Sequence, residues 1–257
     1  MDSIITNNYP IHFNNKAYEE LNIFVKKNNF SKIIVLTDSN TKLLCLEKFY
    51  SKFDKTCDTA NISFSSGEKN KNLSTCEDLW TSISDYGLDR NSLIINLGGG
   101  VVTDLGGFVA STFMRGIQFI NVPTTLLAMV DASIGGKTGI DLNNIKNQIG
   151  VINNPSMVII DSDFLETLPL EEIKSGFSEM IKHSLITGIK YWESMKLINI
   201  NTFCPGNCFF NSILIKSKIV DNDPFEKGLR KFLNYGHTVG HAIETYCLNT
   251  NSRKDLS

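Results

Sequence analysis

The sequence predicts an α/β N-terminal domain with a mostly parallel sheet, over residues 1–161, followed by an all-α C-terminal domain over residues 162–257. Two observations predict this organisation. Apolar runs rich in isoleucine and valine alternate with helix-length segments in the first part of the chain. Beyond about residue 161 the strand signals stop and helical periodicity continues alone. Because parallel strands need a crossover connection, usually a helix, the alternation favours a parallel sheet flanked by helices.

Five apolar runs are expected to be buried strands, at residues 32–36, 61–64, 92–97, 117–122 and 157–160. Three segments are expected to be helices of the second domain, at residues 169–186, 207–222 and 228–248. No long linker separates the two halves in the sequence. We therefore expect them to pack around a shared cleft, which is a common place for a ligand.

The composition is that of a globular protein, because 257 residues with 42% apolar side chains can fill a sizeable core. Twenty-five basic and 27 acidic residues give a net charge of -2, without the run of like charges that would follow a phosphate backbone, so nucleic acid is not expected as a partner. The N-terminal segment lacks the features of a secretion signal, and no stretch approaches the roughly 20 apolar residues that span a bilayer. We expect a cytoplasmic protein with no membrane partner, and free thiols at its six cysteines.

A strand, three glycines and a helix follow one another around Gly98, Gly99 and Gly100. This arrangement lets backbone N–H groups and a helix N-terminus approach a pyrophosphate, which favours nucleotide binding. A glycine cluster is also typical of a tight turn beneath a close helix contact, and the segment lacks the G-x-G-x-x-G spacing. Two further polar clusters, at residues 37–40 and 67–71, follow expected strands. All three clusters should meet at the carboxyl edge of the sheet, where open α/β folds bind ligands.

Small residues and single charges are concentrated between Asp131 and Lys137, after the Pro-Thr-Thr sequence at 123–125 and before Lys146 and Asn147. Such a density of glycine, threonine and single charged residues is expected of a ligand-binding site and is unusual for a hydrophobic core.

In the second domain, Glu179, Lys182 and His183 occupy positions i, i+3 and i+4 of one expected helix, so they share a face. Taken alone, this triplet is typical of a solvated face with an incidental ion pair.

The strongest local pattern is a polar stripe on the last expected helix, formed by Arg230, Asn234, His237 and His241. An ordinary helix places apolar residues on its inward stripe. The two histidines are one turn apart, so both could ligate zinc with Glu179 as the third ligand. One of them could equally be a hydrogen-bonded core residue.

Several motifs, taken in order, resemble the 3-dehydroquinate synthases, a family of sugar-phosphate cyclases, across nearly the whole chain: GGGVVTDLGGFVAS, RGIQFINVPTTLLAMVDASIGGKTGID, KNQIG, SEMIKH and GLRKFLNYGHTVGHAIE. The resemblance implies a lyase of the shikimate pathway to aromatic amino acids, which converts 3-deoxy-D-arabino-heptulosonate 7-phosphate to 3-dehydroquinate and phosphate. It implies NAD, used catalytically, and a divalent metal, Zn²⁺ or Co²⁺. It also implies a homodimer.

The resemblance assigns roles to individual residues. NAD contacts would come from Asp38, Asn40, Glu68, Lys71, Gly99, Gly100, Val101, Asp104, Thr124, Thr125, Asp131, Lys137, Lys146 and Thr167. The phosphorylated sugar-acid substrate would be surrounded by Asp131, Lys137, Asn147, Lys182, Lys216, Arg230, Asn234 and His241, with Arg115 reaching it from a neighbouring subunit. Lysine and arginine suit a ligand that bears phosphate and carboxylate. Zinc would be held by Glu179 and His237, so His241 goes to the substrate although its spacing alone allowed it to bind metal.

One more metal ligand is implied by the resemblance, a histidine in a His-Gly-Glu motif beyond the paired histidines. The sequence has only His12, His183, His237 and His241. Because catalytic zinc usually takes three protein ligands, we expect the helical domain to be incomplete, and this chain to bind zinc poorly and turn over little substrate. Three alternatives stay open: a related sugar-phosphate cyclase, a metal-dependent polyol dehydrogenase that releases NADH, and a truncated chain that binds NAD without catalysis.

Overall fold

The computed structural model describes residues 2–143, 145–200, 207–236 and 240. Its main sheet has seven strands in the order β1-β2-β9-β6-β5-β3-β4, and an antiparallel hairpin, β7-β8, forms a second sheet. Every pair in the main sheet is parallel except β1–β2. The strands are β1 (Ile4–Ile5), β2 (Pro10–Phe13), β3 (Lys32–Asp38), β4 (Asp58–Phe64), β5 (Leu93–Gly98), β6 (Gln118–Pro123), β7 (Lys137–Leu142), β8 (Ile145–Ile152) and β9 (Val158–Ile160).

Helices connect these strands and make up the described chain after β9. The α-helices are α1 (Asn14–Asn28), α2 (Ser39–Leu44), α3 (Leu46–Lys52), α4 (Leu73–Asp85), α5 (Gly100–Thr112), α6 (Leu170–Thr187), α7 (Ile189–Lys196) and α8 (Asn207–Asn222). The short 3₁₀ helices are η1 (Glu68–Asn70), η2 (Phe113–Arg115), η4 (Ser162–Thr167) and η6 (Leu229–Asn234). A π-helical turn, η3 (Ala128–Ala132), ends where the N–H of Ser133 donates to the carbonyl of Ala128, five residues earlier, at 3.1 Å.

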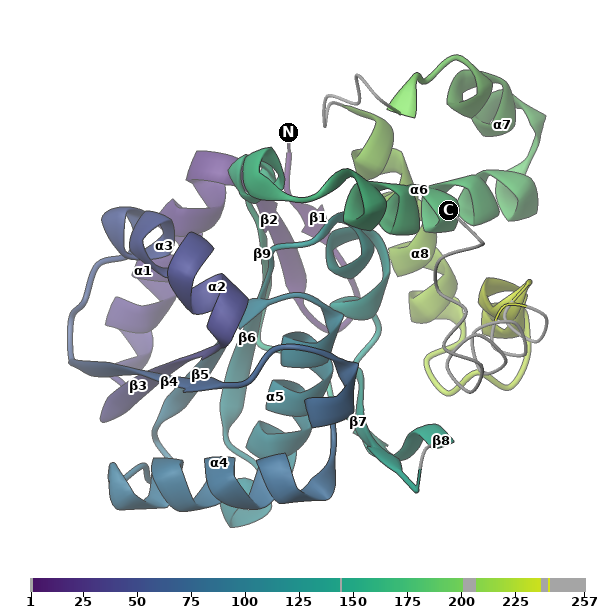
Figure 1. Ribbon diagram of the computed structural model, residues 1–257. Helices are drawn as coiled ribbons and strands as arrows, with labels where there is room; N and C mark the ends of the chain where they lie inside the picture. The colour runs from purple at the N-terminus through teal and green to yellow at the C-terminus, as the bar shows by residue number, and fades with distance from the viewer. Residues whose placement is uncertain (1, 144, 201–206, 237–239, 241–257) are drawn as a thin grey trace.

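Helices cover both faces of the main sheet (Figure 1). Alternate residues of β3 point to opposite faces. Ile33 and Val35 join the core beneath α1 and α3, whereas Ile34 and Leu36 join the core beneath α4 and α5. The first of these cores continues into the helical half through side chains of α6 and α8, such as Phe177. No helix in the described ranges is both long and apolar enough to cross a membrane.

The parallel sheet and the helical segment after it confirm the expected fold class, and all five expected strands are present. The strands β1, β2, β7 and β8 were not anticipated. The first two are only two and four residues long, and β8 is mostly exposed, with its apolar residues interrupted by Lys146, Asn147 and Gln148. None of them therefore leaves a long apolar run in the sequence.

The helix expected over residues 228–248 is wrong over residues 229–236, whereas Gly240 is helical and its N–H donates to the carbonyl of Gly236 at 3.0 Å. Leu229–Asn234 is a 3₁₀ helix, Tyr235 and Gly236 form a turn, and Gly236 has a φ of +84°. Glycine adopts this left-handed conformation readily and commonly ends helices with it. The polar stripe predicted for this segment is therefore not carried by one continuous helix.

Candidate active site

The carboxyl ends of β3, β5 and β6 lie next to one another because these strands pair in parallel register. The carbonyl of Gly98, which ends β5, accepts the N–H of Thr124, just past β6, at 3.0 Å. Gly98 has no room for a side chain, since a Cβ there would stand 2.4 Å from Cγ2 of Val102 in α5. Gly99 caps α5 and Gly100 opens it. The first N–H groups of this helix, which lack intrahelical partners, therefore lie at the edge of the sheet, as an anion-binding turn requires.

Other residues expected at the cofactor follow these strand ends. Asp38 ends β3, and its Oδ1 accepts the N–H of Thr41 at 2.8 Å as the cap of α2. Glu68 and Lys146 face each other, with 3.8 Å between Oε1 and Nζ. The remaining candidates of this group are half-buried or exposed: Asn40, Val101, Thr125 and Thr167. Their contacts with NAD stay a prediction.

A buried lysine connects the end of η1 with α5 and β8. Lys71 is 3% exposed, and its Nζ donates to Oδ2 of Asp104 on α5 and to Oδ1 of Asn147 on β8, each at 2.6 Å. Burial opposes the charged form of the lysine, but Asp104 outweighs burial, and the pKa of Lys71 is raised. Lys71 is thus an ammonium at neutral pH, and it brings together three residues that were predicted from separate motifs.

A second charged pair crosses from the sheet half to the helical half. Lys216 of α8, 5% exposed, pairs through Nζ with Oδ1 of Asp131 on η3 and donates to the backbone carbonyl of Asp131 at 2.6 Å. Burial lowers the pKa of Lys216. Burial acts to raise the pKa of Asp131, but Lys216 and Lys182 outweigh it, and the pKa of Asp131 is lowered. The Asp131 carboxylate is therefore ionised at neutral pH.

Glu179, Lys182 and His183 share one face of α6 as expected, but that face is largely buried against η3 and α8, so its interpretation as a solvated face is wrong. Lys182 is 6% exposed and pairs with Glu179. His183 is fully buried, and burial lowers its pKa to about 4, which leaves the ring neutral at pH 7. Periodicity revealed the shared face but could not reveal what packs on it.

Three potential metal ligands converge at this point. One ligand atom each from Asp131, Glu179 and His183 lies within 4.8 Å of the other two. Two carboxylates and an imidazole are a ligand set that suits Zn²⁺ or Co²⁺. By the family resemblance, Glu179 was expected at the metal and Asp131 at the substrate and cofactor, whereas His183 was expected at neither.

Arg230 is 2% exposed and is held by main-chain carbonyls. Its Nη1 donates to the carbonyl of Pro224 at 2.7 Å and its Nη2 to that of Gly135 at 2.9 Å. Gly135 has a φ of +105°, and a Cβ there would lie 2.4 Å from Nη2 of Arg230. Glycine is therefore required both by the backbone and by the approach of the guanidinium. The N–H of Gly135 donates to the hydroxyl of Tyr9 at 2.8 Å.

Glu226, which no sequence motif indicated, links two predicted residues. Its Oε1 accepts from Nδ2 of Asn234 at 2.6 Å, and its Oε2 pairs with Lys137. Nearby, Oδ2 of Asp223 accepts the N–H of Arg230 at 3.0 Å. The acidic sequence DNDPFE directly before the polar segment was the available signal. That sequence does not indicate that Glu226 pairs with Lys137, which is 89 residues away in the chain.

Three predicted residues are not brought to this cluster by the described structure. Arg115 is exposed in η2, at the opposite end of α5 from Gly100, and the helix between them is about 20 Å long. Its expected role therefore depends on a neighbouring subunit. His237 and His241 lie outside the described residues.

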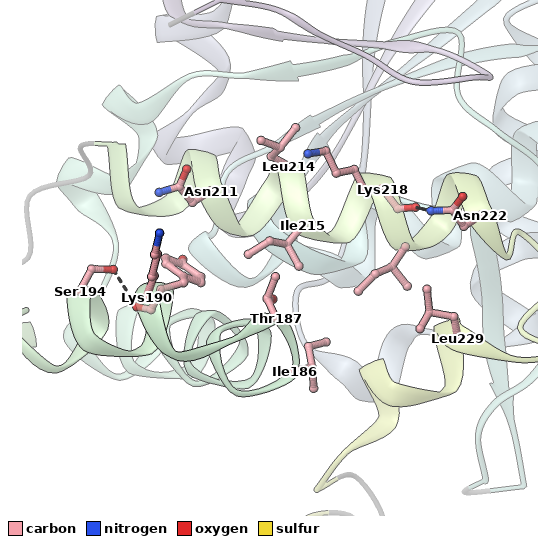
Figure 2. A pocket seen from close by; sticks show the side chains of 12 residues that line it. Ile186, Thr187, Lys190, Ser194, Asn211, Leu214, Ile215, Lys218, Asn222 and Leu229 are labelled. Atoms are coloured by element: carbon pink, nitrogen blue, oxygen red, sulfur yellow. Dashed lines mark hydrogen bonds between the residues drawn. The ribbon is translucent and has the colours of Figure 1, made fainter.

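The helical half also carries a groove of about 590 Å³ between α8 and the helices α6 and α7 (Figure 2). Apolar side chains such as Ile186 and Leu214 line it together with Lys190 and Lys218. It lies on the face of α8 that does not carry Lys216, so it is separate from the charged cluster.

A parallel sheet with a glycine turn at its carboxyl edge, next to a buried cluster of lysines, carboxylates and an arginine, is the arrangement of a nucleotide-dependent α/β enzyme. Residues 61–175 match the N-terminal part of 3-dehydroquinate synthase, and residues 176–252 match its C-terminal part. The chain belongs to the 3-dehydroquinate synthase family.

Individual relatives support this membership. The 3-dehydroquinate synthase of Parabacteroides distasonis is 44% identical over 233 residues, which cover 88% of this chain and 65% of that protein. The enzyme of the same name from Symbiobacterium thermophilum is 40% identical over 245 residues, 92% of this chain and 68% of that protein. The chain thus spans about two thirds of the length of these relatives. A 2-deoxy-scyllo-inosose synthase, solved with carbaglucose-6-phosphate, NAD⁺ and Co²⁺, is 28% identical with a TM-score of 0.87 and covers 96% of this chain and 70% of that one.

Proposed function

We propose that this protein is a 3-dehydroquinate synthase. It converts 3-deoxy-D-arabino-heptulosonate 7-phosphate to 3-dehydroquinate and phosphate, with NAD used catalytically. NAD binds to the α/β domain, residues 1–161, while the helical domain, residues 162–257, provides most of the substrate and metal site. The observation that carries the proposal is the buried pairing of Asp131 with Lys216, 85 residues apart in the sequence, beside the pair of Glu179 and Lys182.

The described residues fit both cofactors. The edge at Gly99 and Gly100 offers helix N–H groups to a pyrophosphate. Asp131, Glu179 and His183 offer oxygen and nitrogen ligands, which suit Co²⁺ or Zn²⁺, and the relative solved with Co²⁺ supports a divalent metal. When bound, NAD supplies a hydride acceptor for a substrate hydroxyl, and the metal polarises that hydroxyl.

The side chains of the chain itself bind the substrate and move its protons. Lys182, Lys216 and Arg230 are buried cations, which suit a ligand that bears both phosphate and carboxylate. In surroundings that exclude water they stabilise the charge that develops on a departing phosphate more strongly than exposed cations do. Because burial lowers the pKa of Lys216, this lysine gives up a proton more readily than an exposed lysine.

A homodimer is part of the proposal. Arg115 is exposed, has a left-handed φ of +70° and lies a helix length away from the glycine edge of its own chain. We assign it to the site of a second copy. The cytoplasmic location stays a prediction from the sequence.

Phosphate release from the heptulosonate phosphate, followed together with NADH absorbance, tests the proposal. The protein with NAD and Zn²⁺ should release phosphate without net NADH. Lys182→Met should lower kcat/KM by about 100-fold or more, since it removes a buried cation from the site. Lys48→Met, which removes a lysine bound to the carbonyl of Asp163, should leave kcat/KM unchanged. Release of phosphate from glucose 6-phosphate instead, or net production of NADH, would contradict the assignment.

A further inference from the structure

Tyr9 is a buried tyrosine that reaches the candidate active site from the turn between β1 and β2. It is 4% exposed, and its hydroxyl accepts the N–H of Gly135 at 2.8 Å, 126 residues away in the sequence. A buried tyrosine hydroxyl usually has a hydrogen-bond partner, so the bond by itself is ordinary. Its consequence depends on what Gly135 contacts in turn.

The turn between β1 and β2 fixes the backbone of Tyr9. The hydroxyl of Thr6 donates to the carbonyl of Tyr9 at 2.6 Å and accepts the N–H of Tyr9 at 3.1 Å. The N–H of Asn7 lies 3.2 Å from each carboxylate oxygen of Asp221, near the end of α8. The turn that carries Tyr9 is therefore closed by its own side chain and tied to the helical half of the molecule.

Gly135 and Gly136 lie in the link between η3 and β7, and both have left-handed backbones, with φ of +105° and +66°. Glycine loses more conformational freedom on folding than any other residue, so a pair of glycines needs contacts from other elements to keep one conformation. The structure provides a contact on each side of Gly135. Its N–H donates to Tyr9, and its carbonyl accepts Nη2 of Arg230 at 2.9 Å.

The orientation of the Arg230 guanidinium depends on this glycine. The carbonyl of Gly135 is one of the two main-chain carbonyls that hold the guanidinium. The planar peptide groups on either side of Gly135 share its Cα, so a change at its N–H also turns its carbonyl. Burial raises the pKa of Tyr9 to about 12, although Gly135 and Arg230 act against burial. The hydroxyl is thus neutral at pH 7 and leaves the charge of the arginine uncompensated.

We propose that Tyr9 is a positioning residue for the anionic substrate, which acts through Gly135 on the guanidinium of Arg230. The inference deepens the proposed function and rests on it, because it takes Arg230 as a substrate-binding residue. A guanidinium recognises phosphate or carboxylate through a planar fork of donors, so its orientation matters as much as its charge. Loss of the Tyr9 hydroxyl should therefore weaken substrate binding only while Arg230 is present.

Calorimetric titration with a phosphonate analogue of the substrate, in the presence of NAD and Zn²⁺, tests the proposal. Tyr9→Phe keeps the ring, removes the hydroxyl and should weaken binding of the analogue about fivefold. Arg230→Met keeps a long side chain, removes the guanidinium and should weaken binding by about 100-fold. In the Arg230→Met background, Tyr9→Phe should change the affinity by less than about twofold, because the group that Tyr9 positions is absent.

Two controls distinguish positioning from a general loss of structure. Tyr18 is equally buried, at 3% exposed, and its hydroxyl donates to Oδ2 of Asp161 at 2.9 Å. Tyr18→Phe should leave the affinity for the analogue unchanged, although it too removes a buried hydroxyl. Tyr9→Phe should bind NADH as tightly as the wild type in a fluorescence titration. The proposal is overturned if Tyr9→Phe loses NADH and the analogue equally, or if Tyr18→Phe weakens the analogue as much as Tyr9→Phe does.

The double variant separates the inference from the function on which it rests. An equal loss of affinity from Tyr9→Phe in the wild-type and Arg230→Met backgrounds would mean that Tyr9 acts independently of Arg230, and would overturn the inference. Wild-type affinity in Tyr9→Phe, with a loss in Arg230→Met, would also overturn it and leave the proposed function standing. Wild-type affinity in Arg230→Met would refute the substrate-binding role of Arg230, and with it the inference. Arg230→Lys, which keeps the charge without the planar fork, provides a second background with the same expected outcomes if Arg230→Met does not fold.

Discussion

Among the residues that the structure describes, main-chain carbonyls, including that of Gly135, hold the side chain of Arg230, and no carboxylate pairs with it. Two of its five N–H donors are used on main-chain carbonyls, which fix the plane of the guanidinium. A carboxylate in the same place would neutralise the charge that an anionic substrate needs. Main-chain carbonyls hold the group in place and leave its full charge.

Gly135→Ala should therefore disturb both the fold and the site. Gly67 provides a matched control, because its φ of +104° equals that of Gly135 within a degree and its Cβ would meet nothing within 4 Å. Gly67→Ala should cost about 1–2 kcal/mol of unfolding free energy for the left-handed backbone alone. Gly135→Ala should cost at least about 1 kcal/mol more, because it also displaces Arg230.

Urea unfolding measures these free-energy costs. Calorimetric titration with a phosphonate analogue of the substrate measures the affinity of the site for that analogue. We expect the analogue to bind about tenfold more weakly to Gly135→Ala, which corresponds to about 1.4 kcal/mol. Gly67→Ala should leave this affinity unchanged. Equal losses of stability and affinity in the two variants would show that the contact with Arg230 has no part in either.

At the scale of elements, α5 lies so close to the sheet that Gly106, in its middle, has no space for a side chain. A Cβ on Gly106 would stand 2.1 Å from Oδ1 of Asn96, and Asn96 donates from Nδ2 to Oδ1 of Asn121 at 2.9 Å. Gly106→Ala should lower the unfolding free energy by about 2–3 kcal/mol through overpacking. Gly100→Ala, where the nearest atom is 3.4 Å away, should change it by less than about 1 kcal/mol. Similar values for both variants in denaturant unfolding would argue against the close approach.

A buried network joins α1, α3 and the loop before η4. The hydroxyl of Tyr18 donates to Oδ2 of Asp161 at 2.9 Å, and Nζ of Lys52 donates to the same oxygen at 2.8 Å. Burial and Asp161 raise the pKa of Tyr18. For Lys52, burial acts downward, but hydrogen bonds to Asp161 and Asp163 prevail and raise the pKa.

This network predicts a loss of stability in alkali. Both groups keep their protons to higher pH in the folded protein than in the unfolded chain, where they titrate near pH 10. Their stabilisation is therefore complete below about pH 10 and is lost as the pH rises further. The unfolding free energy should fall between about pH 9.5 and pH 11, and Tyr18→Phe should make that fall shallower. An unchanged pH dependence in the variant, measured by urea unfolding, would exclude Tyr18 as a source.

At the scale of the whole molecule, the core beneath α1 and α3 continues into the helical half, so the two halves should unfold together. The two tryptophans of the sequence report on them separately, because Trp80 lies on α4 and Trp192 on α7. The single-tryptophan variants Trp80→Phe and Trp192→Phe should show coincident urea midpoints by fluorescence. Two separate midpoints would mean that the halves are independent folding units.

The sequence predicts the sheet well because long apolar runs and glycine turns are local signals. The sheet edge around Gly98 follows from them, since parallel strands place their carboxyl ends side by side. What the sequence does not show is which polar faces become buried. The burial of His183 and the pairing of Glu226 with Lys137 depend on elements far apart in the chain, and a turn at Tyr235 and Gly236 interrupts the helix that periodicity predicts there. Such features are decided by tertiary packing.

The π-helical turn η3 makes the charged cluster depend on the number of residues as well as on their kind. A π turn contains one residue more than an α turn, so η3 behaves as a single-residue insertion in the segment that carries Asp131. Removing one residue such as Ala128 would restore α-helical pitch and turn the Asp131 side chain by roughly 100° about the helix axis, away from Lys216 and His183. Every functional side chain would still be present in such a chain. The carboxylate of Asp131 would nevertheless be lost to the site, so this segment needs its number of residues as much as their identity.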